Sequence, residues 1–188
     1  MKKQIYKWLF FQRMGWKISG NIDENIKKSV FMVIPHTSWH DFFIGVFVRG
    51  IIGLEINFVG KKELFRFPLG GFFRYMGGAA LDRTGGLNKV DAIANVFLNK
   101  PVFRLSIAPE GTRKKVTELK TGFYYIALKA NVPIIPVAFD YKNKVVKMGD
   151  PFYPTGNIEE DLPIILKHFI GVEGKIPQNS FVVKQPIE

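Results

Sequence analysis

The chain passes from a buried strand into a helix through the stretch SVFMVIPHTSWHDFF, residues 29–43. Its first six residues are largely apolar and β-branched, which predicts a strand buried in a sheet. Pro35 cannot donate to a sheet ladder, so we expect the strand to stop there. The apolar run 41–54 is long enough for a buried helix. His36 is therefore predicted at a strand end and Asp41 in the first turn of a helix, where the helix dipole favours a carboxylate.

The two polar side chains at this turn, His36 and Asp41, can meet across it and form a chemically useful pair. A carboxylate on one imidazole nitrogen fixes the tautomer of the ring and leaves the other nitrogen able to accept a proton. The pair lacks the nucleophile of a hydrolase triad, which suits an enzyme whose substrate supplies the hydroxyl. The alternative is a histidine that only caps a helix. Spacing alone does not separate the two, because an H-x4-D pair arises by chance in about one in nine such sequences.

Composition excludes several classes of function. The 188 residues include no cysteine, which rules out disulfides, thiolate metal ligands and a cysteine acyl-enzyme. With only three histidines, a dedicated metal site is not expected. The net charge of +11 indicates an anionic partner, which could be a membrane, a phosphate-bearing substrate or nucleic acid. Nucleic acid is the least favoured of the three, because zinc-finger spacing, RNP-like motifs and recognition-helix patterns are missing.

The length predicts a single domain over residues 1–188. The longest apolar stretch, residues 42–54, would extend about 20 Å as a helix, short of the ~30 Å hydrocarbon core of a bilayer. We therefore expect a cytoplasmic protein. Residues 1–19, the N-terminal segment, mix lysines with aromatic side chains, which favours a helix lying on an anionic membrane. The alternative is a helix packed across the core.

Strands and helices alternate along the rest of the chain. We expect strands at residues 55–60, 79–81, 102–108, 134–141 and 145–148, the last two paired across a polar turn. We expect helices at residues 63–75 (in short pieces), 88–99, 121–128 and 159–170, and a wrapping tail after them. Such alternation predicts a mainly parallel sheet covered by helices on both faces. Functional side chains follow several strand ends, which form the usual ligand-binding edge of such a sheet.

A second motif follows the strand predicted at residues 102–108. It reads PEGTR, residues 109–113, and EGTR is expected by chance in only about one in a thousand such chains. H-x4-D followed about seventy residues later by EGTR resembles the glycerolipid acyltransferases, the family of the lysophosphatidate acyltransferases. A block that begins GKKELF and ends with Asp-Arg, residues 60–83, and VPIIPV, residues 132–137, resemble two further blocks of this family. The likeness covers residues 14–155, in order.

This resemblance implies both a fold and an activity. The fold is α/β, a single domain with a mostly parallel sheet and helices on both faces, similar to glycerol-3-phosphate acyltransferase. The activity is O-acyl transfer in phospholipid biosynthesis, from acyl-CoA or acyl carrier protein to the hydroxyl of a lysophospholipid. Lysophosphatidate, which becomes phosphatidate, is the expected acceptor. No cofactor is implied besides the thioester co-substrate, and the expected location is peripheral, on the inner face of the cell membrane.

The resemblance also implies roles for individual residues. His36 takes the proton of the acceptor hydroxyl, and Asp41 orients the imidazole ring. The expected substrate-binding residues are Lys61, Arg83, Glu110, Gly111, Thr112 and Arg113. Among them, Arg113 offers a planar fork that matches a phosphate, with Lys61 and Arg83 as supporting cations. Gly111 allows close approach of the backbone and is a candidate for stabilising the oxyanion.

Several alternatives stay open at this point. His40 stands beside Asp41 and could compete with His36 for it. Glu110 could hold Arg113 through a salt bridge. The acceptor could be another lysolipid, because a guanidinium selects the phosphate and not the head group. A catalytically idle, membrane-bound lipid-binding protein of the same fold is the alternative from another class.

Overall fold

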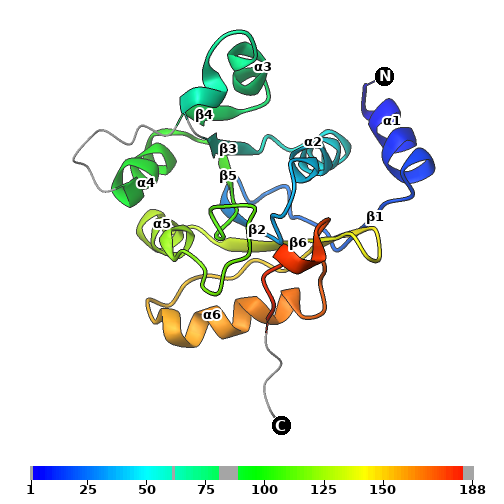
Figure 1. Cartoon of the computed structure of the whole chain (residues 1–188). Coiled ribbons are helices and arrows are strands. Elements are labelled where there is room, and N and C mark those ends of the chain that lie inside the picture. The colour runs from blue at the N-terminus through cyan, green and yellow to red at the C-terminus, as the bar shows by residue number, and fades with distance from the viewer. Residues whose placement is uncertain (1, 61, 81–88, 184–188) are drawn as a thin grey trace.

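The computed structural model describes residues 2–60, 62–80 and 89–183. Within these ranges a seven-stranded sheet forms the centre, with strand order β1-β7-β6-β2-β5-β3-β4 (Figure 1). The strands are β1 (Lys17–Ser19), β2 (Lys28–Ile34), β3 (Asn57–Gly60), β4 (Gly78–Ala80), β5 (Phe103–Ile107), β6 (Ile134–Asp140) and β7 (Val145–Met148). β6 and β7 pair antiparallel, and the other neighbouring strands pair parallel. The predicted, mostly parallel sheet is confirmed, although the short β1 falls outside the predicted strands.

Helices cover both faces of this sheet, as predicted (Figure 1). The α-helices are α1 (Lys2–Lys7), α2 (His40–Ile52), α3 (Gly70–Tyr75), α4 (Lys89–Asn99), α5 (Gly122–Ala130) and α6 (Ile158–Leu166). A π-helical stretch, Trp8–Arg13, continues α1, and 3₁₀-helices occupy Lys62–Phe65, Lys167–Phe169 and Pro177–Asn179. In the described part of the chain, none of the helices combines the length and apolar character needed to cross a bilayer.

Both faces of β2 are buried, each in its own apolar cluster. Val30, Met32 and Ile34 pack on the face covered by α4, α5 and α6. Phe31 belongs to the opposite cluster, with side chains of α2 and the N-terminal segment. A parallel strand buried on both faces has a nearly continuous apolar composition, which is the signal that predicted this strand. Its central position fixes the point at which the chain leaves the sheet towards His36.

The N-terminal segment packs against α2. Phe10 is completely buried in the α2 cluster, whereas Ile5 and Trp8 lie exposed on the outward side. The interpretation of this segment as a helix packed across the core is therefore borne out for its inward face.

The predicted functional residues follow strands that are parallel neighbours in the sheet. β2 pairs with β5, and β5 pairs with β3, so the carboxyl ends of the three strands meet at one edge. His36 follows β2, and Glu110 follows β5 by three residues. Lys61 directly follows β3, but it lies outside the described residues, as does Arg83. The candidate site therefore lies at this edge of the sheet.

Candidate active site

The structure brings His36 and Asp41 together at the carboxyl end of β2. Nδ1 of His36 lies 3.1 Å from Oδ2 of Asp41. Asp41 is buried, whereas 32% of the His36 side chain is exposed. Within residues 2–60, 62–80 and 89–183, the other ring nitrogen, Nε2, has no hydrogen-bond partner. A carboxylate this close to Nδ1 favours a proton on that nitrogen, so Nε2 is left as the proton acceptor.

Three hydrogen bonds hold the Asp41 carboxylate in place. The backbone N–H groups of Thr37 and Ser38 donate to Oδ2, each at 2.9 Å. The hydroxyl of Tyr141 donates to Oδ1 at 2.7 Å. Hydrogen bonds to an ionised acceptor are roughly twice as strong as neutral ones. Because the two amides belong to the loop that carries His36, this carboxylate ties the loop to the first turn of α2.

Tyr141 is a site residue that sequence reasoning missed. It directly follows β6, which is the parallel neighbour of β2 with Ile34 opposite Ala138, so the two strands end side by side. Burial, together with the hydrogen bond to Asp41, raises the pKa of the Tyr141 hydroxyl and keeps it a proton donor. The available signal was a polar side chain at the end of a strand, but recognising it required knowing that β6 lies beside β2.

The question of the second histidine is answered by a different hydrogen bond. Nδ1 of His40 lies 2.9 Å from Oγ of Ser38, and the His40 amide donates to the same oxygen at 3.3 Å. The His40 ring also lies against Trp39, with ring centroids 4.1 Å apart. His40 therefore bonds Ser38 at the start of α2 and does not compete with His36 for Asp41.

Glu110, in the second motif, is hydrogen-bonded to the backbone of His36 in the first motif. It is buried, and its Oε2 accepts a hydrogen bond of 2.7 Å from the backbone N–H of His36. Its other oxygen, Oε1, is also buried, and the backbone N–H of Phe181 approaches the carboxyl group. Burial raises the pKa of Glu110 to about 7, against the opposing effect of the His36 amide and ring. The carboxyl group therefore supports the His36 loop and makes no salt bridge with Arg113 in the described structure.

The rest of the EGTR motif forms an exposed turn. Gly111 has a φ of +64°, a conformation that favours glycine, and its amide donates to the carbonyl of Ala108 at 3.0 Å. This amide is thus engaged within the turn, and the oxyanion role expected for Gly111 stays a prediction. Thr112 and Arg113 are exposed, and no ion pair engages the Arg113 guanidinium within the described ranges. Arg113 therefore lies exposed to solvent on this turn.

A loop near the C-terminus supports both motifs. The backbone N–H of Ile176 donates to Oγ1 of Thr37 at 3.1 Å. Nδ2 of Asn179 donates to the carbonyl of Arg113, also at 3.1 Å. The wrapping tail expected from the sequence is thus confirmed up to residue 183, the last that the structure describes. It braces the His36 loop and the Arg113 turn from one side.

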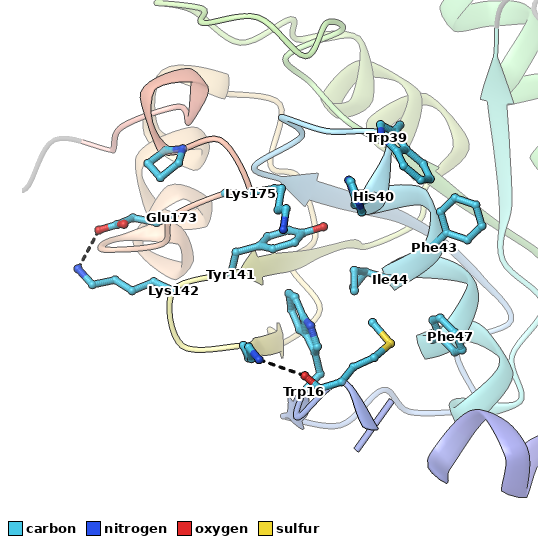
Figure 2. A pocket seen from close by; sticks show the side chains of 14 residues that line it. Trp16, Trp39, His40, Phe43, Ile44, Phe47, Tyr141, Lys142, Glu173 and Lys175 are labelled. Atoms are coloured by element: carbon cyan, nitrogen blue, oxygen red, sulfur yellow. Dashed lines mark hydrogen bonds and ion pairs between the residues drawn. The ribbon is translucent and has the colours of Figure 1, made fainter. Parts of the chain in front are cut away.

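A cavity of about 730 Å³ lies between the N-terminal segment, α2, the turn after β6 and the loop near the C-terminus (Figure 2). Its walls are mainly aromatic and apolar, from the N-terminal segment and from α2, and they include Trp16, Phe43 and Phe47. Three lysines line it too, Lys142, Lys144 and Lys175, and Lys142 forms an ion pair of 2.8 Å with Glu173, which is also in the lining (Figure 2). Tyr141 also lines the cavity, and its hydroxyl bonds Asp41. An apolar wall beside cationic groups suits an amphiphile with an anionic part.

The raised pKa of Glu110 predicts a pH dependence of stability. A carboxyl group with an ordinary pKa of 4.5 and a folded pKa of about 7 binds more protons in the folded state between these values. Its contribution to the free energy of unfolding should therefore fall as pH rises through this window, by about 3 kcal/mol in total. Urea unfolding gives the free energy of unfolding of the wild type and of Glu110→Gln at each pH from 4 to 8. Over this range the wild type should lose about 3 kcal/mol more than the variant. An equal loss in the two proteins would contradict the assignment.

Comparison with known proteins shows which family this chain resembles. A family model described as Acyltransferase matches residues 17–140. The 1-acyl-sn-glycerol-3-phosphate acyltransferase of Escherichia coli is 38% identical over 97 residues, which are 48% of this chain and 40% of that protein. The chloroplastic enzyme of this name from Brassica napus, BAT2, is 29% identical over 119 residues, 61% of this chain and 35% of that protein. The chain spans 35% to 57% of the first curated relatives it matches.

A solved structure supports the fold. The crystal structure of the 1-acyl-sn-glycerophosphate acyltransferase PlsC from Thermotoga maritima superposes with a TM-score of 0.57 at 23% identity. The match covers 88% of this chain and 72% of that one. The expected acyltransferase-like α/β fold is thus confirmed. Because the family model covers more than half of the residues of this chain, the chain belongs to the acyltransferase family.

Proposed function

We propose that the chain transfers a fatty acyl group from acyl-CoA or acyl carrier protein to the hydroxyl of a lysophospholipid, with lysophosphatidate as the acceptor and phosphatidate as the product. The observation that carries the proposal is the contact of 3.1 Å between His36 and Asp41. The carboxylate of Asp41 engages Nδ1 of this partly exposed histidine, so Nε2 remains available as the base. The family and the names of the relatives favour a glycerolipid acceptor.

The reaction requires a base, and His36 supplies it. Nε2 takes the proton of the acceptor hydroxyl while the oxygen attacks the carbonyl carbon of the thioester. Asp41 stabilises the imidazolium that forms, as the carboxylate of a serine triad does. The tetrahedral intermediate then collapses, the C–S bond breaks, and the thiolate leaves with the proton held by His36. The product is an ester, and no residue of the chain is acylated.

Arg113 is the proposed binding residue for the acceptor phosphate. Its guanidinium is exposed on the turn after β5, and Glu110 in the same turn bonds the amide of His36. A guanidinium can bind a phosphate through two parallel hydrogen bonds, which an ammonium group cannot do. Lys61 and Arg83 remain proposed partners on the basis of the family resemblance alone.

The proposed place of the reaction is an anionic membrane surface on the inner face of the cell membrane. Lipid substrates with long chains reside there, and a net charge of +11 attracts the chain to anionic head groups. The lysines of the N-terminal segment are exposed or partly exposed and can contribute to this attraction. Each basic residue near such a surface contributes about 1 kcal/mol.

The catalytic proposal predicts different outcomes for the two histidines. His36→Ala should lower kcat at least about a thousand-fold, and Asp41→Asn should lower it by about two to four orders of magnitude. His40→Asn should change kcat only a few-fold, because His40 bonds Ser38. Acyl transfer to a panel of lysolipids, with both donor types, can be followed by mass spectrometry, with circular dichroism as the check on folding. An inactive His40→Asn beside an active His36→Ala would refute the assignment.

The acceptor-site proposal predicts a selective change in KM. Arg113→Ala should raise the KM for lysophosphatidate by about ten- to hundred-fold and leave the KM for the acyl donor nearly unchanged. Arg113→Lys should also be impaired, since it retains the charge and loses the fork. Lys114→Ala, a change of the neighbouring exposed cation, is the matched control. If Arg113→Ala raises both KM values equally, Arg113 does not define a dedicated acceptor site.

A further inference from the structure

Four large apolar side chains stand exposed on one protruding segment. We call residues 66–75, which lead into and include α3, the aromatic tip. Phe67 is 98% exposed and Tyr75 is 76% exposed, and Leu69 and Phe72 are also exposed. Figure 1 shows α3 at the outer end of the molecule, beyond β3 and β4. Apolar side chains gathered in this way on a protrusion mark an interaction surface.

The conformation of the aromatic tip is held by specific contacts. The amide of Gly70 donates to the carbonyl of Arg66 at 2.8 Å. A Cβ added at Gly70 would lie 2.1 Å from the carbonyl oxygen of Phe65, so only glycine fits this close approach. The guanidinium of Arg74 donates to the same carbonyl of Phe65, whose side chain is buried. The exposed side chains are thus presented from an anchored turn.

A row of aromatic rings connects this tip with the catalytic loop. The ring of Phe72 lies 6.4 Å from that of Phe42, and Phe42 lies 5.5 Å from Phe43. Phe43 in turn meets Trp39 at 5.3 Å, and Trp39 lies in the loop between His36 and Asp41. A surface that binds at the tip is therefore continuous, through apolar side chains, with the edge where the dyad lies.

Positive charge accompanies the apolar side chains. Arg66 and Arg74 belong to the tip and are both exposed, and Glu63 is an acidic neighbour just before it. Basic and aromatic side chains together on an exposed surface suit the interfacial region of a bilayer, where rings enter the head-group layer and cations meet anionic lipids.

We propose that the aromatic tip docks on a bilayer containing anionic lipids, with Phe67 and Leu69 inserted into its interface. This inference rests on the proposed function for its purpose, since a lipid acceptor must travel from the bilayer to His36. The outward side of the N-terminal segment, with Ile5 and Trp8, is the competing surface. It exposes fewer large side chains, because the inward side is used for packing on α2.

Vesicle binding by three paired variants tests the proposal. Phe67→Ser/Leu69→Ser changes the tip, and Ile5→Ser/Trp8→Ser changes the N-terminal segment. Ile164→Ser/Val182→Ser, the α6 pair, changes two side chains that are more than half exposed; Ile164 belongs to α6, which lies at the opposite end of the molecule from α3 in Figure 1. Co-sedimentation uses vesicles of phosphatidylcholine with phosphatidylglycerol. We expect the tip variant to bind at least about tenfold more weakly, and the α6 pair to bind as the wild type does.

A second measurement does not depend on weakened binding. Because the chain has no cysteine, Phe67→Cys and Ile164→Cys each create a single labelling site for an environment-sensitive dye. We expect the dye at position 67 to shift its emission to shorter wavelength on the same vesicles, and the dye at position 164 to show no shift. This comparison holds even if the serine variants fold poorly.

The outcomes separate this inference from the proposed function. No vesicle binding by the wild type, equal weakening by the tip and α6 pairs, or weakening by the N-terminal pair alone would overturn the docking surface. Transfer to a water-soluble, short-chain lysolipid should be the same in the tip variant and the wild type. If neither transfers acyl groups but vesicle binding still depends on Phe67, the proposed function fails and the docking surface stands.

Discussion

The buried carboxylate of Asp41 is the interaction on which the site depends. It accepts hydrogen bonds from two amides of the His36 loop and from the hydroxyl of Tyr141, and it contacts the imidazole of His36. These groups come from the ends of two neighbouring parallel strands, β2 and β6, and meet at the first turn of α2. A buried charge is tolerated only where such partners surround it. The requirement to satisfy Asp41 therefore holds the histidine ring in the orientation that the proposed reaction needs.

A second buried carboxyl group joins the two sequence motifs. Glu110 lies 74 positions from His36 along the chain and accepts a hydrogen bond from its amide. The motif that carries the proposed phosphate-binding Arg113 is thus attached to the backbone of the proposed base. This arrangement gives Glu110 a structural reason to accompany an arginine three residues later without forming a salt bridge to it. This one buried contact therefore joins the turn after β5 to the loop after β2 at the edge of the sheet.

The parts of the fold that follow from local composition were predictable from the sequence. β2, α2 and the strand before the EGTR motif lie close to where apolar runs and Pro35 place them. The contacts that depend on strand order were not, since the position of Tyr141 beside Asp41 requires β6 to neighbour β2. The burial of Glu110 and the hydrogen bonds of His40 and of the Gly111 amide also arise from the folded structure, so local composition did not predict them. The assignments of Lys61 and Arg83 remain predictions from resemblance alone.

The tautomer of His36 tests the central claim most directly. If Asp41 orients the ring, neutral His36 carries its proton on Nδ1 and presents an unprotonated Nε2. Nitrogen-15 NMR of histidine-labelled protein at about pH 8.5, well above the ordinary histidine pKa of about 6.5, distinguishes the two tautomers, and His36→Gln identifies the signal. The account predicts the Nδ1–H form for His36. A proton resident on Nε2 would contradict the account, because the nitrogen assigned as the base would already be occupied.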